Sequence, residues 1–485
     1  MVCLSSITYL ASTIILGSVL VKAVPTNTPH SVSTTSGPKW TDKDKIVVSI
    51  DVPDADNFPM AAYTILSNPG KKVAIVVSGR KVDFGWLNWG HVQDSNSETV
   101  MKKILSEVGK LKLPGPAIKY LIQVTSKEDV AGWVTKLPKD AQPWFTTMDE
   151  NVQDHADVYM EISKIRLVKF LDKLKIPPTR YEIFLQGSAT KQILEGIKHA
   201  QHVHDWSWDL DTDADAAMKK CKDAKPTTPH DKVRGECISK ALKDFIARNH
   251  KGQGTWKASE VQGTSDIGST LDKYFGDATS PYRYFNGGPM TEFASHISKP
   301  SAKIPESVAM LQSFFRPSNL LGVQFNHAID VASSVKSMNA AVDGKLRLFL
   351  VPTEISKDSP WVFDEAKLTQ AFGASSPVKE LAMHFATAAG LKSILFDLIT
   401  AVYFKHPEIF PPAIKATYSI VNGFVELKPA TADSKSELYV VGLGLVKDPA
   451  SVGFPQMKAA RETLDKALGA KEKDLMDVLK KAFQG

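Results

Sequence analysis

Short apolar runs and amphipathic segments alternate along the chain from residue 45 onward. The runs "KIVVSID" (45–51) and "KKVAIVVSG" (71–79) have the length and composition of strands that are buried on both faces of a sheet. Between them, "FPMAAYTIL" (58–66) is typical of a helix. The same pattern predicts further strands at 116–124, 282–290, 345–352, 416–427 and 436–446, and further helices at 97–111, 155–176, 189–200, 237–250, 378–404 and from about Met457 onward.

This alternation predicts an α/β fold with a mostly parallel central sheet and helices on both of its faces. Residues 202–280 break the rhythm with polar and Gly/Ser/Thr-rich stretches, so we interpret them as a helical and polar insertion in one domain that spans 45–485. In open parallel sheets, ligands bind outside the carboxyl ends of the strands. A functional site is therefore expected at that edge.

The first 23 residues have the pattern of a secretory signal. An apolar core is followed by Val21 and Ala23, which fit a cleavage site for small residues. An uncleaved membrane anchor is the alternative, although Ser, Thr and Gly interrupt the run. We expect a secreted, extracellular protein that has no stable membrane insertion after cleavage. Residues 24–44 are rich in Pro, Ser and Thr and are expected to form a loose, disordered leader.

Cysteine usage agrees with export. Cys3 leaves with the signal, and Cys221 and Cys237 remain within the insertion. In an oxidising compartment these two can form a disulfide, whose short loop would contribute about 3 kcal/mol in the chain-entropy description. Two free buried thiols are the alternative.

The charge balance argues against nucleic acid as a partner. The chain has 59 basic and 53 acidic residues, a formal net charge of +6, and its Lys residues are scattered along the sequence. A dedicated nucleic-acid surface needs a clustered basic patch.

Oxygen-bearing side chains gather directly after the first predicted strand. Asp51, Asp54, Asp56 and Asn57 fall within seven positions. One interpretation is a solvated turn in which Asp56 caps the next helix. The other is a site for a hard cation, since carboxylate and amide oxygens are what such ions bind.

The acidic segment resembles the N-terminal signature of the inosine–uridine-preferring nucleoside hydrolases, D-T-D-P-G-x-D-D, at the end of a first strand. Further segments are similar to family motifs and follow in the family's order, with the region 125–280 poorly matched. These segments are "NGGPMTEFASHI" (286–297), "GVQFNHAIDVASSVKSM" (322–338), "LFLVPTEI" (348–355) and "LFDLITAVYFKHPEIF" (395–410). The resemblance implies a nucleoside-hydrolase-like sheet and hydrolysis of the N-glycosidic bond of ribonucleosides, so that a nucleoside or ribose is the expected partner.

The resemblance also implies roles for individual residues. Asp51 would be the general base, acting on a water that a bound Ca²⁺ activates. Asp51, Asn57, Thr291 and Asp397 would surround the metal. The sugar would be held by a set of polar side chains, Asp56, Asn319, Gln324 and Asn326.

Several positions depart from the family pattern. "DVPDADN" is one residue shorter than the signature, so whether Asp54 replaces the missing acid is open. Asn57 and Gln324 stand where the family has carboxylates, and Phe396 stands where it has a His linked to departure of the base. Fewer anionic ligands imply weaker calcium binding. A catalytically inactive, secreted protein that binds ribose or nucleosides or acts as an effector on the same scaffold is therefore the alternative function.

Overall fold

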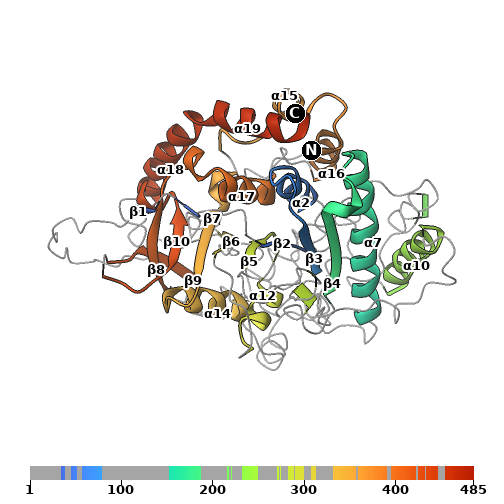
Figure 1. Cartoon of the computed structure of the whole chain (residues 1–485), viewed down its shortest axis with the longest axis horizontal. Coiled ribbons are helices and arrows are strands. Elements are labelled where there is room, and N and C mark those ends of the chain that lie inside the picture. The colour runs from blue at the N-terminus through green and yellow to red at the C-terminus, as the bar shows by residue number, and fades with distance from the viewer. Residues whose placement is uncertain are drawn as a thin grey trace, which may run out of the picture.

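In a computed structural model of the chain, the described residues form a ten-stranded sheet flanked by helices (Figure 1). The structure describes residues 34–35, 37–38, 45–51, 57–78, 152–186, 216–217, 220, 232–249, 270–271, 274, 282–288, 290–299, 307–312, 331–356, 359–389, 395–421, 424–431, 433–445 and 454–485. The strands are β1 (Thr34–Thr35), β2 (Lys45–Asp51), β3 (Val73–Ser78), β4 (Tyr181–Gln186), β5 (Tyr282–Asn286), β6 (Ser307–Gln312), β7 (Arg347–Pro352), β8 (Ala413–Val421), β9 (Phe424–Pro429) and β10 (Leu438–Val441).

The sheet confirms the predicted α/β class. Its strand order is β1-β8-β10-β7-β6-β5-β2-β3-β4, with β9 paired to β8. From β10 to β4 every neighbouring pair is parallel, whereas β8 runs antiparallel to β10, β9 and β1. Because β2 lies between β5 and β3, its carboxyl end is in the interior of the parallel region.

The helices lie on both faces of this sheet. They are α2 (Asn57–Leu66), α7 (Val152–Lys173), α10 (Lys232–Asn249), α12 (Thr291–His296), α14 (Val331–Val342), α15 (Glu365–Phe372), α16 (Pro377–Ala389), α17 (Phe396–Lys405), α18 (Phe454–Gly469) and α19 (Glu472–Gln484), with short 3-10 turns at Pro178–Arg180, Thr353–Ile355, Pro407–Ile409 and Leu443–Leu445. Figure 1 shows α2 and α17 side by side on one face, and α12 and α14 on the other.

Two apolar clusters form the core, one on each face of the sheet. Successive residues of a strand point to opposite faces, so Val48 and Ile50 pack with α2, α7 and α17, while Val47 packs with α12 and α14. All seven residues of β2 are buried. This explains why β2 is a nearly continuous apolar run rather than an alternating one.

The predicted strands and helices are confirmed at 45–51, 58–66, 71–79, 155–176, 237–250, 282–290 and 345–352, within a few residues at each end. The predicted elements at 97–111, 116–124 and 189–200 lie outside the described residues, as do the expected signal at 1–23 and most of the insertion at 202–280. Within the segment expected to be a loose leader, Thr34 and Thr35 pair with β8.

The single helix predicted at 378–404 was wrong, because two helices, α16 and α17, occupy this stretch. The break places Asp397 in the first turn of α17. There the partial positive charge of the helix N-terminus favours a carboxylate, whereas the middle of one long apolar helix would not.

The predicted strand at 416–427 was also wrong as a single element. β8 and β9 pair antiparallel here, with Val421 opposite Phe424. The sequence between these two residues is Asn-Gly, a dipeptide that favours tight hairpin turns. The strand predicted at 436–446 exists as β10, which pairs with β8 as expected and also with β7. The amphipathic helical tail predicted from about Met457 is confirmed and consists of α18 and α19.

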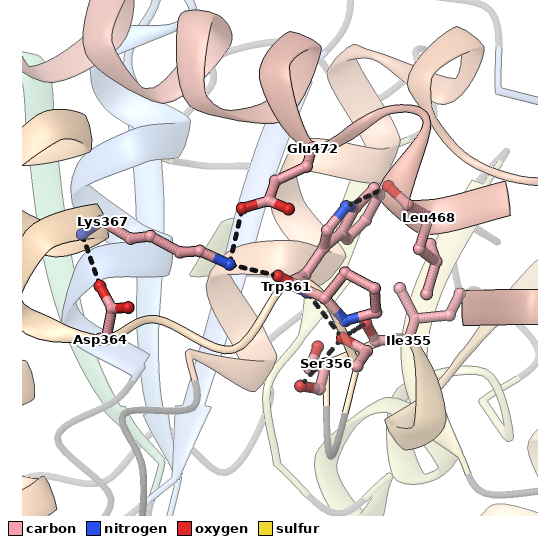
Figure 2. Close-up of polar contacts among 9 residues, drawn as sticks. Ile355, Ser356, Trp361, Asp364, Lys367, Leu468 and Glu472 are labelled. Carbon is pink, nitrogen blue, oxygen red and sulfur yellow. Dashed lines mark hydrogen bonds and ion pairs between the residues drawn. The ribbon is translucent and has the colours of Figure 1, made fainter. Parts of the chain in front are cut away.

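The C-terminal helices are attached to the domain by a set of polar contacts (Figure 2). The Trp361 indole N–H donates to the carbonyl of Leu468 over 2.9 Å. Lys367 Nζ lies 2.6 Å from a carboxylate oxygen of Glu472 and donates to the carbonyl of Pro360. Apolar side chains of α19, among them Leu475 and Leu479, are buried in the same core as α2. The C-terminal helices therefore belong to the layer that supports α2.

No helix among the described residues has both the length and the apolar character required to cross a bilayer.

Arg180 joins the end of α2 to the start of β4. Its guanidinium donates to the carbonyls of Ile65, Asn68 and Lys71 over 2.9, 2.8 and 3.1 Å. Carbonyl groups at a helix C-terminus have no partner within the helix and carry partial negative charge. A cation at this position therefore holds α2 in place at the end opposite Asn57.

We predict that Arg180→Ala lowers the free energy of unfolding by about 2 to 3 kcal/mol, since three hydrogen bonds from a charged donor are lost. Urea unfolding followed by circular dichroism measures this change. Lys240→Ala is the matched control, because it removes an exposed ion pair with Asp244 that is worth less than about 1 kcal/mol. Equal losses in the two variants would contradict this role for Arg180.

Candidate functional site

The candidate site begins where β2 ends and α2 starts. Asp51 is the last residue of β2, and its side chain is only 1% exposed. Asn57 is the first residue of α2 and is completely buried. The Asn57 Nδ2 group donates to Asp51 Oδ1 over 2.8 Å. The strand end and the helix start, which the sequence analysis placed at one site, are thus in direct contact.

A glycine turn after β5 closes over this pair. The Gly287 N–H donates to the carbonyl of Ser49 over 2.9 Å, which continues the pairing of β5 with β2. A Cβ atom at Gly287 would lie 1.9 Å from Asn57 Oδ1, and one at Gly288 would lie 2.6 Å from Asp51 Cβ. Only glycine permits so close an approach at these two positions.

The same turn leads into α12, whose first residue is Thr291. The segment that carries Thr291, a predicted metal ligand, therefore starts in contact with Asp51 and Asn57.

Asp397 lies at the same end of the sheet. Lys405, the last residue of α17, donates from Nζ to Asn68 Oδ1 just beyond the end of α2. Since α2 and α17 pack side by side (Figure 1), the two helices run in the same direction and their first residues, Asn57 and Phe396, lie at the same end. Asp397 is 3% exposed.

The register of the sheet gives the level of Asp397 along the strands. The Phe404 ring packs 4.6 Å from that of Phe285, which is in register with Val48 of β2. Asp51 is three residues beyond Val48, about 10 Å along the strand, and Asp397 is seven residues before Phe404, about 10.5 Å along the helix. Asp51 and Asp397 therefore lie at a similar level at the carboxyl edge.

Further buried polar residues lie next to this set and were not predicted as site residues. Asn286 ends β5 in register with Ser49, and its amide donates to the carbonyl of Gly288. Among the described residues, none forms a hydrogen bond with Asn286 Oδ1. Glu292 follows Thr291 and is 1% exposed. A polar residue between a buried strand and a Gly-Gly pair, as in "YFNGG", was the available signal for Asn286.

Tyr284 is a buried phenol of β5, in register with Val47 of β2. Burial raises the pKa of Tyr284 well above its usual range, and the charge of Glu292 raises it further. Tyr284 is therefore neutral at physiological pH and adds no negative charge to this part of the sheet.

Several predicted site residues lie outside the described part of the chain, namely Asp54, Asp56, Asn319, Gln324 and Asn326. The predicted disulfide also stays a prediction, because Cys221 lies outside the described residues and only the backbone of Cys237, within α10, is described. Phe396 is the first residue of α17, adjacent to Asp397.

The described candidate ligands have the oxygen atoms that a hard cation binds, but they carry little negative charge. Asp51, Asn57, Asp397 and the Thr291 carbonyl all offer oxygen, the atom that Ca²⁺ prefers. Only two of these groups are carboxylates, and in the described part of the chain no three His, Cys, Asp or Glu side chains are grouped so that they could hold a metal ion. A cation at this site would therefore be bound weakly.

No family model matches the sequence. No curated protein matches it either. Among solved structures, the chain is similar to an inosine-uridine preferring nucleoside hydrolase from Bacillus anthracis, with 10% identity and a TM-score of 0.41 over 87% of this chain and 99% of that one. An inosine-guanosine nucleoside hydrolase gives 12% identity and a TM-score of 0.42 over 87% and 98% of the two chains.

A purine-preferring ribonucleoside hydrolase from Gardnerella vaginalis gives 9% identity and a TM-score of 0.26 over 44% of this chain and 70% of that one. Likeness of this degree carries no argument about activity.

We predict that Gly287→Ala destabilises the protein by about 1 to 3 kcal/mol, the usual cost of forcing extra atoms into a packed region. The added methyl group must displace Asn57, because it would lie 1.9 Å from Asn57 Oδ1. Gly469→Ala is the control, since its added Cβ meets only Pro360 Cγ, at an ordinary 3.8 Å. Urea unfolding compares the two variants, and a loss at Gly287 no larger than at Gly469 would contradict the close approach.

Proposed function

We propose that the protein is an exported nucleoside hydrolase-like enzyme that cleaves the N-glycosidic bond of ribonucleosides. The main support for the proposal is that Asp51, Asn57 and the Gly287–Gly288 turn are in contact at the carboxyl edge of the sheet. These residues belong to two distant segments that each resemble a motif of the family. Asp397, from a third such segment, lies at the same edge.

Asp51 is the proposed general base. It would take a proton from an attacking water while the water oxygen bonds to the anomeric carbon of the ribose. The bond from that carbon to the base nitrogen breaks, its electron pair goes to the departing base, and the base then takes up a proton. Buried carboxylates such as Asp51 stabilise the oxocarbenium-like charge that develops on the sugar.

Asp51, Asn57, Thr291 and Asp397 would hold a Ca²⁺ ion, and when bound the ion would supply polarisation of the attacking water. Asp56, Asn319, Gln324 and Asn326 are proposed to hold the ribose. Phe396 cannot donate a proton, so the departing base receives no help from this position. Nucleosides whose bases are already good leaving groups are therefore the best candidates as substrates.

A secreted protein that binds nucleosides or ribose without turnover is the second candidate. Two features favour it. The Asn57 side-chain N–H group donates a hydrogen bond to Asp51 Oδ1, which is proposed to accept the proton of the attacking water. Phe396, which cannot donate a proton, is adjacent to Asp397. Both features reduce catalytic power, yet neither prevents a sugar from binding.

We predict that the purified protein releases free base from at least one ribonucleoside at about 10 mM Ca²⁺, a concentration above the weakest calcium affinities. Asp51→Asn should lower kcat by about 10² to 10⁴-fold because the general base is lost. Chromatographic detection of the free base measures both. Asp343→Asn, which changes an exposed acid after α14 that pairs with Lys435, is the control and should leave the rate unchanged.

Absence of base release by the wild-type protein above the Asp51→Asn background would reject turnover. Titration of the same nucleosides by calorimetry would then test the binding function. If the wild type binds a nucleoside and Asp51→Asn does not, the non-catalytic function holds.

A further inference from the structure

Asp51 is a buried carboxylate, and a buried charge is costly unless it is compensated. One of its partners is the side-chain amide of Asn57, whose N–H group donates to Asp51 Oδ1 over 2.8 Å. Hydrogen bonds to an ionised acceptor are about twice as strong as neutral ones. Asn57 therefore offsets part of the cost that a bound cation would otherwise offset.

The position of Asn57 adds to this effect. It is the first residue of α2, and the N-terminus of a helix carries a partial positive charge. The first turn of α2 has no acidic residue, and Asp56 directly before it lies outside the described residues. The side-chain amide and the helix start both place partial positive charge near Asp51.

The amide oxygen of Asn57 faces the other way. Asn57 Oδ1 lies against Gly287, so close that a Cβ atom there would be 1.9 Å from it. To act as a ligand for a cation shared with Asp51, the amide must turn so that its oxygen replaces its N–H group. Binding of a cation then costs the hydrogen bond that already stabilises Asp51.

We propose that Asn57 is an internal substitute for the cation, which keeps Asp51 stable without metal and makes calcium binding weak. The inference deepens the proposed site and rests on it, but it concerns cation dependence rather than turnover. An aspartate at position 57 would remove the donor, place a second buried carboxylate against Asp51 and create a strong requirement for a divalent cation.

The test compares the full-length chain with Asn57→Asp, in EDTA and in CaCl₂ up to about 10 mM. Calorimetry measures the calcium affinity, and differential scanning fluorimetry measures the melting temperature. We expect the wild-type melting temperature to differ little between EDTA and calcium. We expect Asn57→Asp to melt lower in EDTA, to recover in calcium and to bind calcium at least about tenfold more tightly, because each added anionic ligand raises affinity.

Asn339→Asp is the matched control. Its amide oxygen accepts a hydrogen bond from the exposed Tyr418 hydroxyl, and the substitution adds the same charge on the α12–α14 face of the sheet, in α14. It should leave the calcium affinity and the calcium response of the melting temperature unchanged. If Asn57→Asp folds only when calcium is present, that outcome supports the proposal.

Equal calcium affinity in the wild type and Asn57→Asp would overturn the proposal, and so would strong stabilisation of the wild type by calcium. Asn57→Ala provides a further test, since it removes the donor without adding charge. It should lower the melting temperature in EDTA, and an unchanged value would also overturn the proposal. Neither readout depends on base release, so failure of the hydrolase function is distinguishable from failure of this inference.

Discussion

The contact between the Asp51 carboxylate and the Asn57 amide is the interaction on which the rest of the site depends. It joins the last residue of a fully buried strand to the first residue of the helix that covers it. The Gly287–Gly288 turn packs against both residues, so the position of α12 and Thr291 follows from this contact. A displacement of Asn57 would be transmitted to each of these elements, because packed interiors leave little free space.

The surrounding fold keeps that contact in place from the far end of α2. Arg180 and Lys405 bind groups at or just beyond the C-terminus of this helix, and α19 packs against the same layer. A helix held at one end by cations and at the other by a strand end has little freedom to slide. The C-terminal helices therefore serve the site indirectly, although they are distant in sequence from every predicted site residue.

Much of the parallel sheet could be predicted from the sequence because its central strands are short runs rich in Val and Ile. β2 and β3 are recognisable for this reason, whereas β4 and β6 were missed. β4 mixes Tyr, Glu and Gln with its apolar residues at the edge of the sheet, and β6 (SVAMLQ) has a single β-branched residue where β2 and β3 have runs of Val and Ile. Such segments become strands because their neighbours pair with them, and pairing partners cannot be found from local pattern alone.

Several residues of the candidate site could be predicted from the sequence, but the contacts between them could not. Family resemblance pointed to Asp51, Asn57, Thr291 and Asp397, yet it implied that Asn57 offers an oxygen to a metal. In the structure, the Asn57 side-chain N–H group instead donates a hydrogen bond to Asp51. The buried positions of Asn286 and Glu292 were also missed, because they follow from the register of β5 against β2. Register between strands that are far apart in sequence cannot be read from composition or periodicity.

A crystal structure of the protein soaked with a ribonucleoside and calcium tests the central claim most directly, that the carboxyl edge around Asp51 is the functional site. We expect electron density for the ribose beside Asp51, between the Gly287–Gly288 turn and the start of α17. Ribose density at any other place on the molecule, with the Asp51 region unchanged, would contradict it.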